Sequence, residues 1–264
     1  MARLSEITFR LPDTTEAHAF LSDLRTLLAD VPYASEAVGR LTLTPPRPDG
    51  ARPVTTFLLA DVPEPEIALD TGQTIGVGGG AAPDEQGPPA GIELAELARR
   101  LAGHVPRVDH TGVNLPTCAD RPEQWQSLVA AVASTATMYR YPTGEPWPFV
   151  LPSSADEFQH GIADFVVGRE PRFELVHDPW RTHPEWQFAL WTDLTRAQLE
   201  LLFPDPQGMT FPGLEEIFRV VPIRSPWPGL GIRFDLCYRI EDGPSDWETG
   251  EWLVRAGGRI PPTP

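Results

Sequence analysis

Aromatic and aliphatic residues dominate positions 185–193, directly after a His183-Pro184 pair, and this pattern predicts a β-strand. Positions 193–203 then show helical apolar spacing. Asp193 or Thr195 can cap this predicted helix, and Pro204 would end it. A single polar residue, Gln187, interrupts the strand. Whether Gln187 faces solvent or a site is therefore the first question that the pattern raises.

The N-terminal third has a different order of elements. Positions 7–11 alternate like a strand, and positions 12–28 show the apolar spacing of a helix. Strands are predicted at 40–44 and 54–59, with a further one at 74–77. The order of a strand, a helix and then strands predicts a small α/β unit over residues 1–77.

Residues 78–91 are rich in Gly, Pro and Ala and form the best linker candidate. The glycines at 76–80 lack both the basic residue and the following helix of a phosphate loop. A short helix is predicted at 92–104, with acidic residues first and Arg99-Arg100 last, in agreement with the helix dipole. Residues 78–105 are accordingly interpreted as a linker and a connector helix.

From residue 106 onward the pattern predicts a second strand-rich region that ends near residue 242, followed by a C-terminal tail at 243–264. Its strands are predicted at 108–116, 138–141, 149–151 and 171–177, with a helix at 122–136. All eight tryptophans lie after residue 105. They could line an aromatic pocket, although most tryptophans in a domain of this kind are expected in the core.

An internal repeat runs through this second region. The segment at 139–142, followed by Pro146-Trp147-Pro148, has a counterpart at 218–222, followed by Pro226-Trp227-Pro228. Each lies after a predicted strand and helix, and the first half carries an insertion near 153–168 that is predicted as a lid-like helix. The repeat predicts two strand-helix-strand-strand-strand units, which pack as one domain because a single unit would leave a sheet face bare.

Four segments of this region place a polar residue within an apolar strand. They lie at 109–115, 173–175, 187–193 and 228–236. In this arrangement they resemble the vicinal oxygen chelate superfamily, the family of glyoxalase I, extradiol dioxygenases and bleomycin-resistance proteins. The resemblance covers roughly residues 106–240. It implies an α+β fold in which paired βαβββ units form a half-barrel mixed sheet, beside the smaller N-terminal α/β unit.

The resemblance also implies a set of metal ligands. Carried over residue by residue, these are His110, Glu174, Gln187 and Asp235. The family usually has Glu at the fourth position, so the shorter Asp235 requires a closer strand or a bridging water. Such nitrogen and oxygen ligands suit Fe, Mn, Ni or Zn as the divalent metal, which could polarise a carbonyl or chelate vicinal oxygens. Glu174 or Asp235 could alternatively serve as the catalytic base.

Each of these residues also has a simpler explanation. A lone strand histidine is usually a hydrogen-bonded structural residue, and alternating polar residues on a strand are usually half-exposed. Their joint position at four equivalent strand sites favours the metal-site interpretation. Arg140 and Arg219 occupy equivalent repeat positions and are candidates for binding a substrate carboxylate, together with Trp191 as an aromatic contact. The two arginines could instead pair with the abundant acids.

Composition removes several classes of function. The net charge is −16, which argues against binding to nucleic acids or anionic membranes. All 21 basic residues are arginine, which excludes a Schiff-base lysine and a Walker-type lysine. The only cysteines are Cys118 and Cys237, and neither belongs to a Cys-x-x-Cys pair, so a structural zinc site built on thiolates is not expected. No signal peptide or membrane span is recognisable, and a cytoplasmic protein is expected.

The leading hypothesis is a metal-dependent isomerase, lyase or dioxygenase that acts on a small oxygenated molecule. The competing hypothesis is a metal-free protein that binds a small aromatic or drug-like ligand, as in the resistance branch of the family. A third possibility is a scaffold for partner binding. The N-terminal unit is interpreted as a degenerate third unit that covers the sheet or mediates formation of a homodimer.

Overall fold

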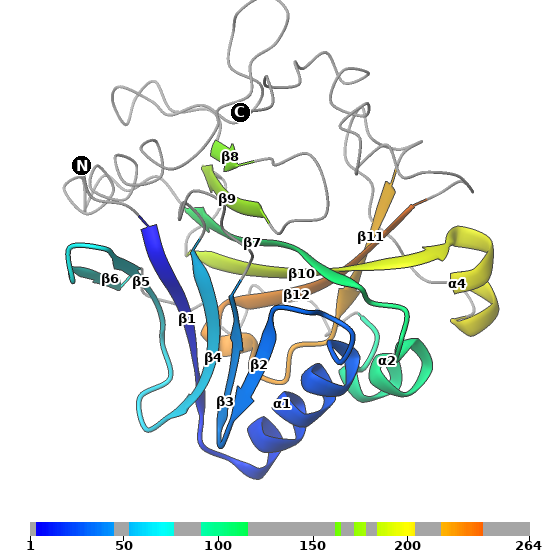
Figure 1. The fold of residues 1–264 in the computed structure, drawn as a ribbon, viewed down its shortest axis with the longest axis horizontal. Coiled ribbons are helices and arrows are strands. Elements are labelled where there is room, and N and C mark those ends of the chain that lie inside the picture. The colour runs from blue at the N-terminus through cyan, green and yellow to red at the C-terminus, as the bar shows by residue number, and fades with distance from the viewer. Residues whose placement is uncertain are drawn as a thin grey trace, which may run out of the picture.

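The computed structural model shows an α+β protein with two six-stranded mixed sheets and few helices (Figure 1). Sheet A has the order β2-β3-β4-β1-β5-β6, and sheet B has the order β11-β12-β10-β7-β9-β8. The structure describes residues 4–44, 53–76, 91–115, 162–164, 172–177, 184–203 and 218–239.

Sheet A is formed by the N-terminal part of the chain. Its strands are β1 (Leu4–Pro12), β2 (Ala34–Ala37), β3 (Arg40–Leu43), β4 (Val54–Ala60), β5 (Pro65–Leu69) and β6 (Thr74–Gly76). Helix α1 (Thr15–Leu27) follows β1 and begins where the Thr14 hydroxyl accepts a hydrogen bond from the Ala17 backbone N–H.

Sheet B is formed by the second region. Its strands are β7 (Arg107–Leu115), β8 (Ile162–Asp164), β9 (Arg172–His177), β10 (Glu185–Thr195), β11 (Phe218–Ile223) and β12 (Ile232–Arg239). Helix α4 (Arg196–Leu202) follows β10, and a 3-10 turn, η3 (Pro228–Leu230), precedes β12. Thr195 and Gln198 cap α4 reciprocally, because each side chain bonds the backbone N–H of the other residue.

The same pairing rule recurs in both sheets. In sheet A the opening strand β1 pairs in parallel with β4, and the full order of strand, helix and three strands lies between residues 4 and 60. In sheet B, β7 pairs in parallel with β9, and β10 pairs in parallel with β12. The two opening strands β7 and β10 lie side by side and antiparallel at the centre of sheet B.

The two sheets pack face to face, and their strands cross at a large angle (Figure 1). The contact is aromatic: Phe57 of sheet A, which stacks on its neighbour Phe9 at a ring-centroid distance of 4.9 Å, makes a T-shaped contact with Phe188 of sheet B at 4.8 Å. All of these rings are buried. A buried hydrogen bond of 3.2 Å between the hydroxyls of Thr55 and Thr111 also joins the sheets. The apolar faces of both sheets therefore form one hydrophobic core.

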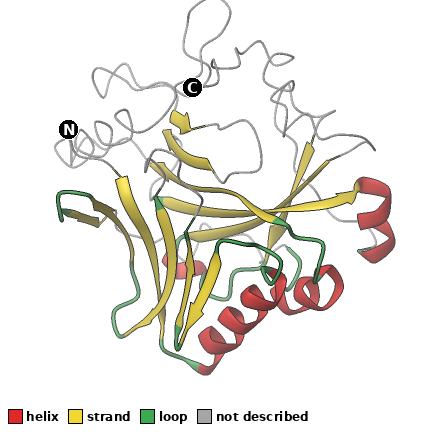
Figure 2. Ribbon diagram, in the orientation of Figure 1, coloured by secondary structure: helices red, strands yellow, loops and turns green. Residues whose placement is uncertain are grey.

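Helix α2 (Leu94–Leu101) corresponds to the predicted connector helix and packs beside α1 (Figure 2). Arg100 of α2 donates a hydrogen bond to the Leu202 carbonyl, and its guanidinium lies 5.4 Å from the centre of the Phe203 ring. Both contacts tie α2 to the end of α4. Among the described helices, none has the length and apolar character needed to cross a membrane.

Most strongly patterned elements in the described residues are confirmed, including the helix and strands at the N-terminus and the strand-helix pair after residue 185. Two strands of sheet A were missed: β2 (Ala34–Ala37), which is mostly exposed and has no apolar alternation, and β5, which begins at Pro65. Within the region predicted as a lid-like helix, residues 162–164 form strand β8, so the helix prediction is wrong for those residues. The helix predicted at 122–136, the strands predicted at 138–141 and 149–151, and the tail at 243–264 lie outside the described residues.

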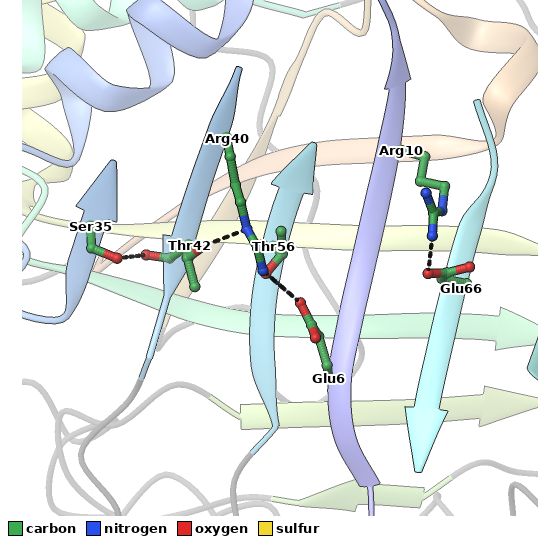
Figure 3. A network of polar contacts seen from close by, with 7 residues as sticks. All are labelled: Glu6, Arg10, Ser35, Arg40, Thr42, Thr56 and Glu66. Carbon is green, nitrogen blue, oxygen red and sulfur yellow. Dashed lines mark hydrogen bonds and ion pairs between the residues drawn. The ribbon is translucent and has the colours of Figure 1, made fainter. Parts of the chain in front are cut away.

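The outer face of sheet A carries a network of polar contacts (Figure 3). Glu6 accepts a hydrogen bond of 2.6 Å from the Thr56 hydroxyl and pairs with Arg40 at 3.4 Å. Arg10 and Glu66 form a separate ion pair of 2.6 Å, with side-chain exposures of 36% and 26%. The charged side chains of this face are paired and partly exposed, whereas Thr56 beside them is buried.

Candidate functional site

Strand β10 presents two chemically different faces. Trp186, Phe188 and Leu190 point into the core that the two sheets share. Because side chains alternate along a strand, Gln187 and Trp191 belong to the opposite face of sheet B. We call that side the polar face of sheet B. Among the described residues, the side chains on this face include Arg107, Asp109, His110, Glu185, Gln187, Ala189, Trp191, Arg233, Asp235 and Cys237.

The register of the strands brings the predicted ligands into two adjacent rows. Ala189 of β10 pairs with His110 of β7 on one side and with Asp235 of β12 on the other. Residues in register on neighbouring strands share a face, so the His110 and Asp235 side chains flank that of Ala189. A small residue at the centre of this row leaves nothing bulky between the imidazole and the carboxylate.

The second row contains the predicted ligand Gln187. Its neighbours in register are Gly112 on β7 and Arg233 on β12, and the backbone of Gly112 pairs in turn with that of Glu174 on β9. Gln187 is only 8% exposed, so it does not face solvent. Three of the four predicted ligands, His110, Gln187 and Asp235, are thus buried on the same face.

A β-bulge brings Asp109 to this face as well. The register between β7 and β10 shifts so that His110 lies opposite Ala189, whereas Val108 lies opposite Leu190. One extra residue, Asp109, is accommodated between them, and its carboxylate Oδ2 lies 2.9 Å from Nδ1 of His110. Both residues are almost completely buried, with exposures of 8% for His110 and 1% for Asp109.

Asp109, His110 and Cys237 form a cluster of potential metal ligands. One donor atom from each lies within 4.8 Å of the donor atoms of the other two, and all three residues are buried. Among the described residues, this is the only group of three or more His, Cys, Asp or Glu side chains with such spacing. The cluster joins β7 and β12 across the central strand β10.

Asp235 lies beside this cluster and is held by an arginine. Its Oδ2 accepts a hydrogen bond of 2.7 Å from Nε of Arg233, and Arg233 also lies 3.7 Å from Glu185. Burial raises the pKa of the Asp235 carboxyl above its usual value, although the charges of Arg233 and His110 act in the opposite direction. Burial lowers the pKa of Arg233, but Asp235 and Glu185 outweigh this effect and leave that pKa raised.

The other oxygen of Asp235, Oδ1, is buried and has no hydrogen-bond partner within the part of the chain that the structure describes. A buried carboxylate oxygen in this state is costly, and such atoms usually have an explanation in function or in a bound group.

The remaining predicted site residues have different positions. Trp191 is buried on the polar face of sheet B, and the Arg107 guanidinium lies over its ring at 4.6 Å from the centroid. Arg219 lies on β11 with its backbone paired to that of Tyr238. Arg140 lies outside the described residues.

Sequence reasoning missed two members of the cluster. Cys237 could have been found from the period of a strand, because it lies two residues after Asp235 and so shares its face. Asp109 gave no such signal, since a regular strand would turn it away from His110. Only the bulge brings the two neighbouring side chains together.

No family model, curated protein or solved structure matches this chain. The buried polar face of sheet B is therefore the basis on which its function can be inferred.

Proposed function

We propose that this protein is a metal-dependent enzyme, an isomerase, lyase or dioxygenase, that acts on a small oxygenated molecule at the polar face of sheet B. One observation carries the proposal: His110, Gln187 and Asp235 are buried together on the side of the sheet that faces away from the hydrophobic core. Burying ionisable groups is expensive unless they are paired or bind a ligand. A concentration of them on one sheet face is therefore a candidate site.

The residues present fit a divalent metal. They offer an imidazole, an amide and carboxylates, and Oδ1 of Asp235 has no hydrogen-bond partner in the described part of the chain. Glu174, the remaining proposed ligand, has its backbone in the same row as Gln187. These ligands suit Fe, Mn, Ni or Zn.

The proposal includes a more specific description of the fold of sheet B. We interpret sheet B as two βαβββ units that form a half-barrel of the vicinal oxygen chelate type. The parallel pairs β7–β9 and β10–β12, and the antiparallel contact between β7 and β10, support this interpretation. Sheet A would then be a third unit, whose apolar face covers that of sheet B.

The chemistry follows from the donors. A bound divalent ion would polarise an oxygen of the substrate. Asp109 would orient the His110 ring through its contact with Nδ1. Glu174 or Asp235 would accept the substrate proton, and Arg140, Arg219 and Trp191 would position the rest of the substrate.

Metal analysis tests the proposal. The protein is reconstituted in turn with Fe(II), Mn(II), Ni(II) and Zn(II), and bound metal is measured by elemental analysis. We expect about one ion per chain in the wild type and in His18→Ala, because His18 is an exposed residue of α1 that pairs with Asp13 in the preceding turn. His110→Ala should lose the ion. Absence of stoichiometric metal from the wild type after all four reconstitutions would contradict the proposal.

Activity is then measured with the metal-loaded protein on small compounds that carry two neighbouring oxygens, such as catechol and hydroxyketones. Turnover should disappear in His110→Ala and persist in His18→Ala. If the wild type binds metal and none of the compounds reacts or binds, the enzyme assignment is wrong for this substrate class.

A metal-free small-molecule-binding protein is the second candidate. The Arg233–Asp235 pair favours it, because this carboxylate already has a cationic partner at 2.7 Å. In that case a ligand should quench the fluorescence of Trp191, which is buried on the polar face of sheet B, without turnover and in the presence of a chelator.

A further inference from the structure

Cys237 lies within the polar face of sheet B although no ligand role follows for it from the family resemblance. We propose that the Cys237 side chain, as a thiolate, binds the metal together with Asp109 and His110, which makes the site selective for zinc. This inference rests on the proposed function, because it assigns the ligands and the metal of that same site. It differs in its donors: the Cys237 sulfur is added, and Asp109 binds the metal directly instead of only orienting the His110 ring.

The geometry supports direct binding. The three donor atoms lie within 4.8 Å of one another. Around a tetrahedral zinc ion with bonds of about 2.0–2.3 Å, neighbouring donors are roughly 3.3–3.8 Å apart. Side-chain rotations that move the donor atoms by about 1 Å would bring them to these distances. The two strands that carry the donors are fixed on either side of β10 by sheet hydrogen bonds.

The small side chain of Ala189, in the row that also holds His110, makes this convergence possible. β7 and β12 flank β10, and neighbouring strands are about 4.8 Å apart, so their backbones are separated by about 10 Å. Side chains must therefore reach toward each other over β10. Ala189, the β10 residue between His110 and Asp235, is the small side chain that leaves room for them.

A second observation points to a cation at the same place. Asp235 lies two residues before Cys237 on β12, and its Oδ1 is buried without a hydrogen-bond partner in the described residues. His110 is close enough to act on Asp235 electrostatically. A cation bound at the neighbouring cluster would give this buried oxygen a favourable electrostatic partner.

The donor set determines the metal. Thiolate sulfur favours zinc and similar soft or borderline ions over Mg²⁺, Ca²⁺ and Mn²⁺, which prefer oxygen. A site with one thiolate is compatible with the sequence, because it does not need the Cys-x-x-Cys pairs that the sequence lacks. A catalytic zinc site commonly has three protein ligands and an open position, which agrees with three donors in the cluster.

Cobalt substitution tests the inference. Co²⁺ replaces zinc, and a cobalt–thiolate bond gives a charge-transfer absorption in the near ultraviolet. We expect about one Co²⁺ per chain and this absorption in the wild type and in Cys118→Ser. The absorption should be absent from Cys237→Ser. Zinc affinity should fall in Cys237→Ser by at least the roughly 10–100-fold that loss of a supporting residue costs at metal sites.

A second measurement avoids any change at the buried Cys237. In the Cys118→Ser background, Cys237 is the only cysteine, and zinc should protect it from alkylation whereas Mg²⁺ should not. Metal that binds with neither the thiolate absorption nor protection would overturn the role of Cys237 and leave the proposed function intact. Failure of every metal to bind would overturn both.

Discussion

Each of the two sheets has one apolar face and one polar face, and the two polar faces are built differently. On sheet A, Arg10, Arg40, Glu6 and Glu66 are each about a quarter to half exposed and form ion pairs (Figure 3). On sheet B, Asp109, His110, Gln187 and Asp235 are 8% exposed or less. The same alternation of side chains thus produces a solvated surface in one sheet and a buried polar layer in the other.

The difference matters because exposed and buried charges contribute differently to the free energy of folding. An exposed ion pair contributes about 0–1 kcal/mol, so the contacts on sheet A need no function to explain them. Buried charges are costly to desolvate, and a pair inside a protein seldom contributes more than well-packed apolar residues would. The polar face of sheet B is therefore better explained by a site than by stability. The predictions below test this contrast.

The largest effect is expected at Asp235. Asp235→Ala removes the 2.7 Å partner of the Arg233 guanidinium. Breaking a buried pair costs about 3–5 kcal/mol, and the lower end is expected here because Arg233 is 23% exposed and keeps Glu185 at 3.7 Å. Glu66→Ala is the matched change on sheet A, where removing the 2.6 Å partner of Arg10 should cost less than about 1 kcal/mol. Denaturant unfolding of both variants, in a chelator so that no metal contributes, measures the difference.

Arg233→Met is the control for the pair as a whole. Combined with Asp235→Ala, it removes both charges, and the double variant should recover part of the stability that Asp235→Ala loses. Equal losses for Asp235→Ala and Glu66→Ala would show that the two polar faces do not differ as described.

Some of these features could be predicted from the sequence and others could not. Gln187 and Asp235 could be placed on a shared face because strand alternation and a family resemblance both apply to them. β1, α1, β10 and α4 were predictable for the same reason: their apolar spacing is long and regular. β2 was not, because an exposed edge strand with the sequence Ala-Ser-Glu-Ala has no apolar pattern to detect.

The cluster could not be predicted, because two of its contacts depend on the tertiary structure. The bulge at Asp109 shows no signature in a single sequence, and the approach of Cys237 to His110 depends on β12 joining β10 in parallel and on β7 joining it antiparallel. Local residue patterns fix which side chains share a face of one strand. They do not fix which strands become neighbours.

An intermediate effect is expected at Tyr33, where the two regions meet. The Tyr33 hydroxyl accepts a hydrogen bond of 3.0 Å from the backbone N–H of Val108, next to Asp109. Tyr33→Phe leaves this buried N–H without that acceptor, which should cost about 1–3 kcal/mol near neutral pH. Thermal or denaturant unfolding at pH 7 gives the value.

The same variant has a predicted pH dependence. Burial raises the pKa of Tyr33 above the ordinary tyrosine value of 10.0, with partial compensation from the Val108 hydrogen bond and from Arg107. The folded state therefore holds this proton more tightly than the unfolded state, so the contribution is complete below pH 10 and is lost as pH rises through the raised pKa. Above pH 10 the stability of the wild type should fall more steeply than that of Tyr33→Phe. Parallel curves would show that Tyr33 ionises as it does in the unfolded chain.

The smallest effect concerns salt, which distinguishes the two polar faces by how strongly solvent ions screen their ion pairs. A double-mutant cycle with Arg10→Met and Glu66→Gln should give a coupling of about 0.2–1 kcal/mol at low ionic strength. At about 1 M salt the screening length is about 3 Å, so this coupling should nearly vanish. The corresponding cycle with Arg233→Met and Asp235→Asn should keep more of its coupling, because the Asp235 carboxylate is only 1% exposed, although the Arg233 side chain is 23% exposed. Equal salt dependence of the two cycles would mean that water and ions reach the polar face of sheet B as freely as that of sheet A, and the energetic reason for assigning a site to it would be lost.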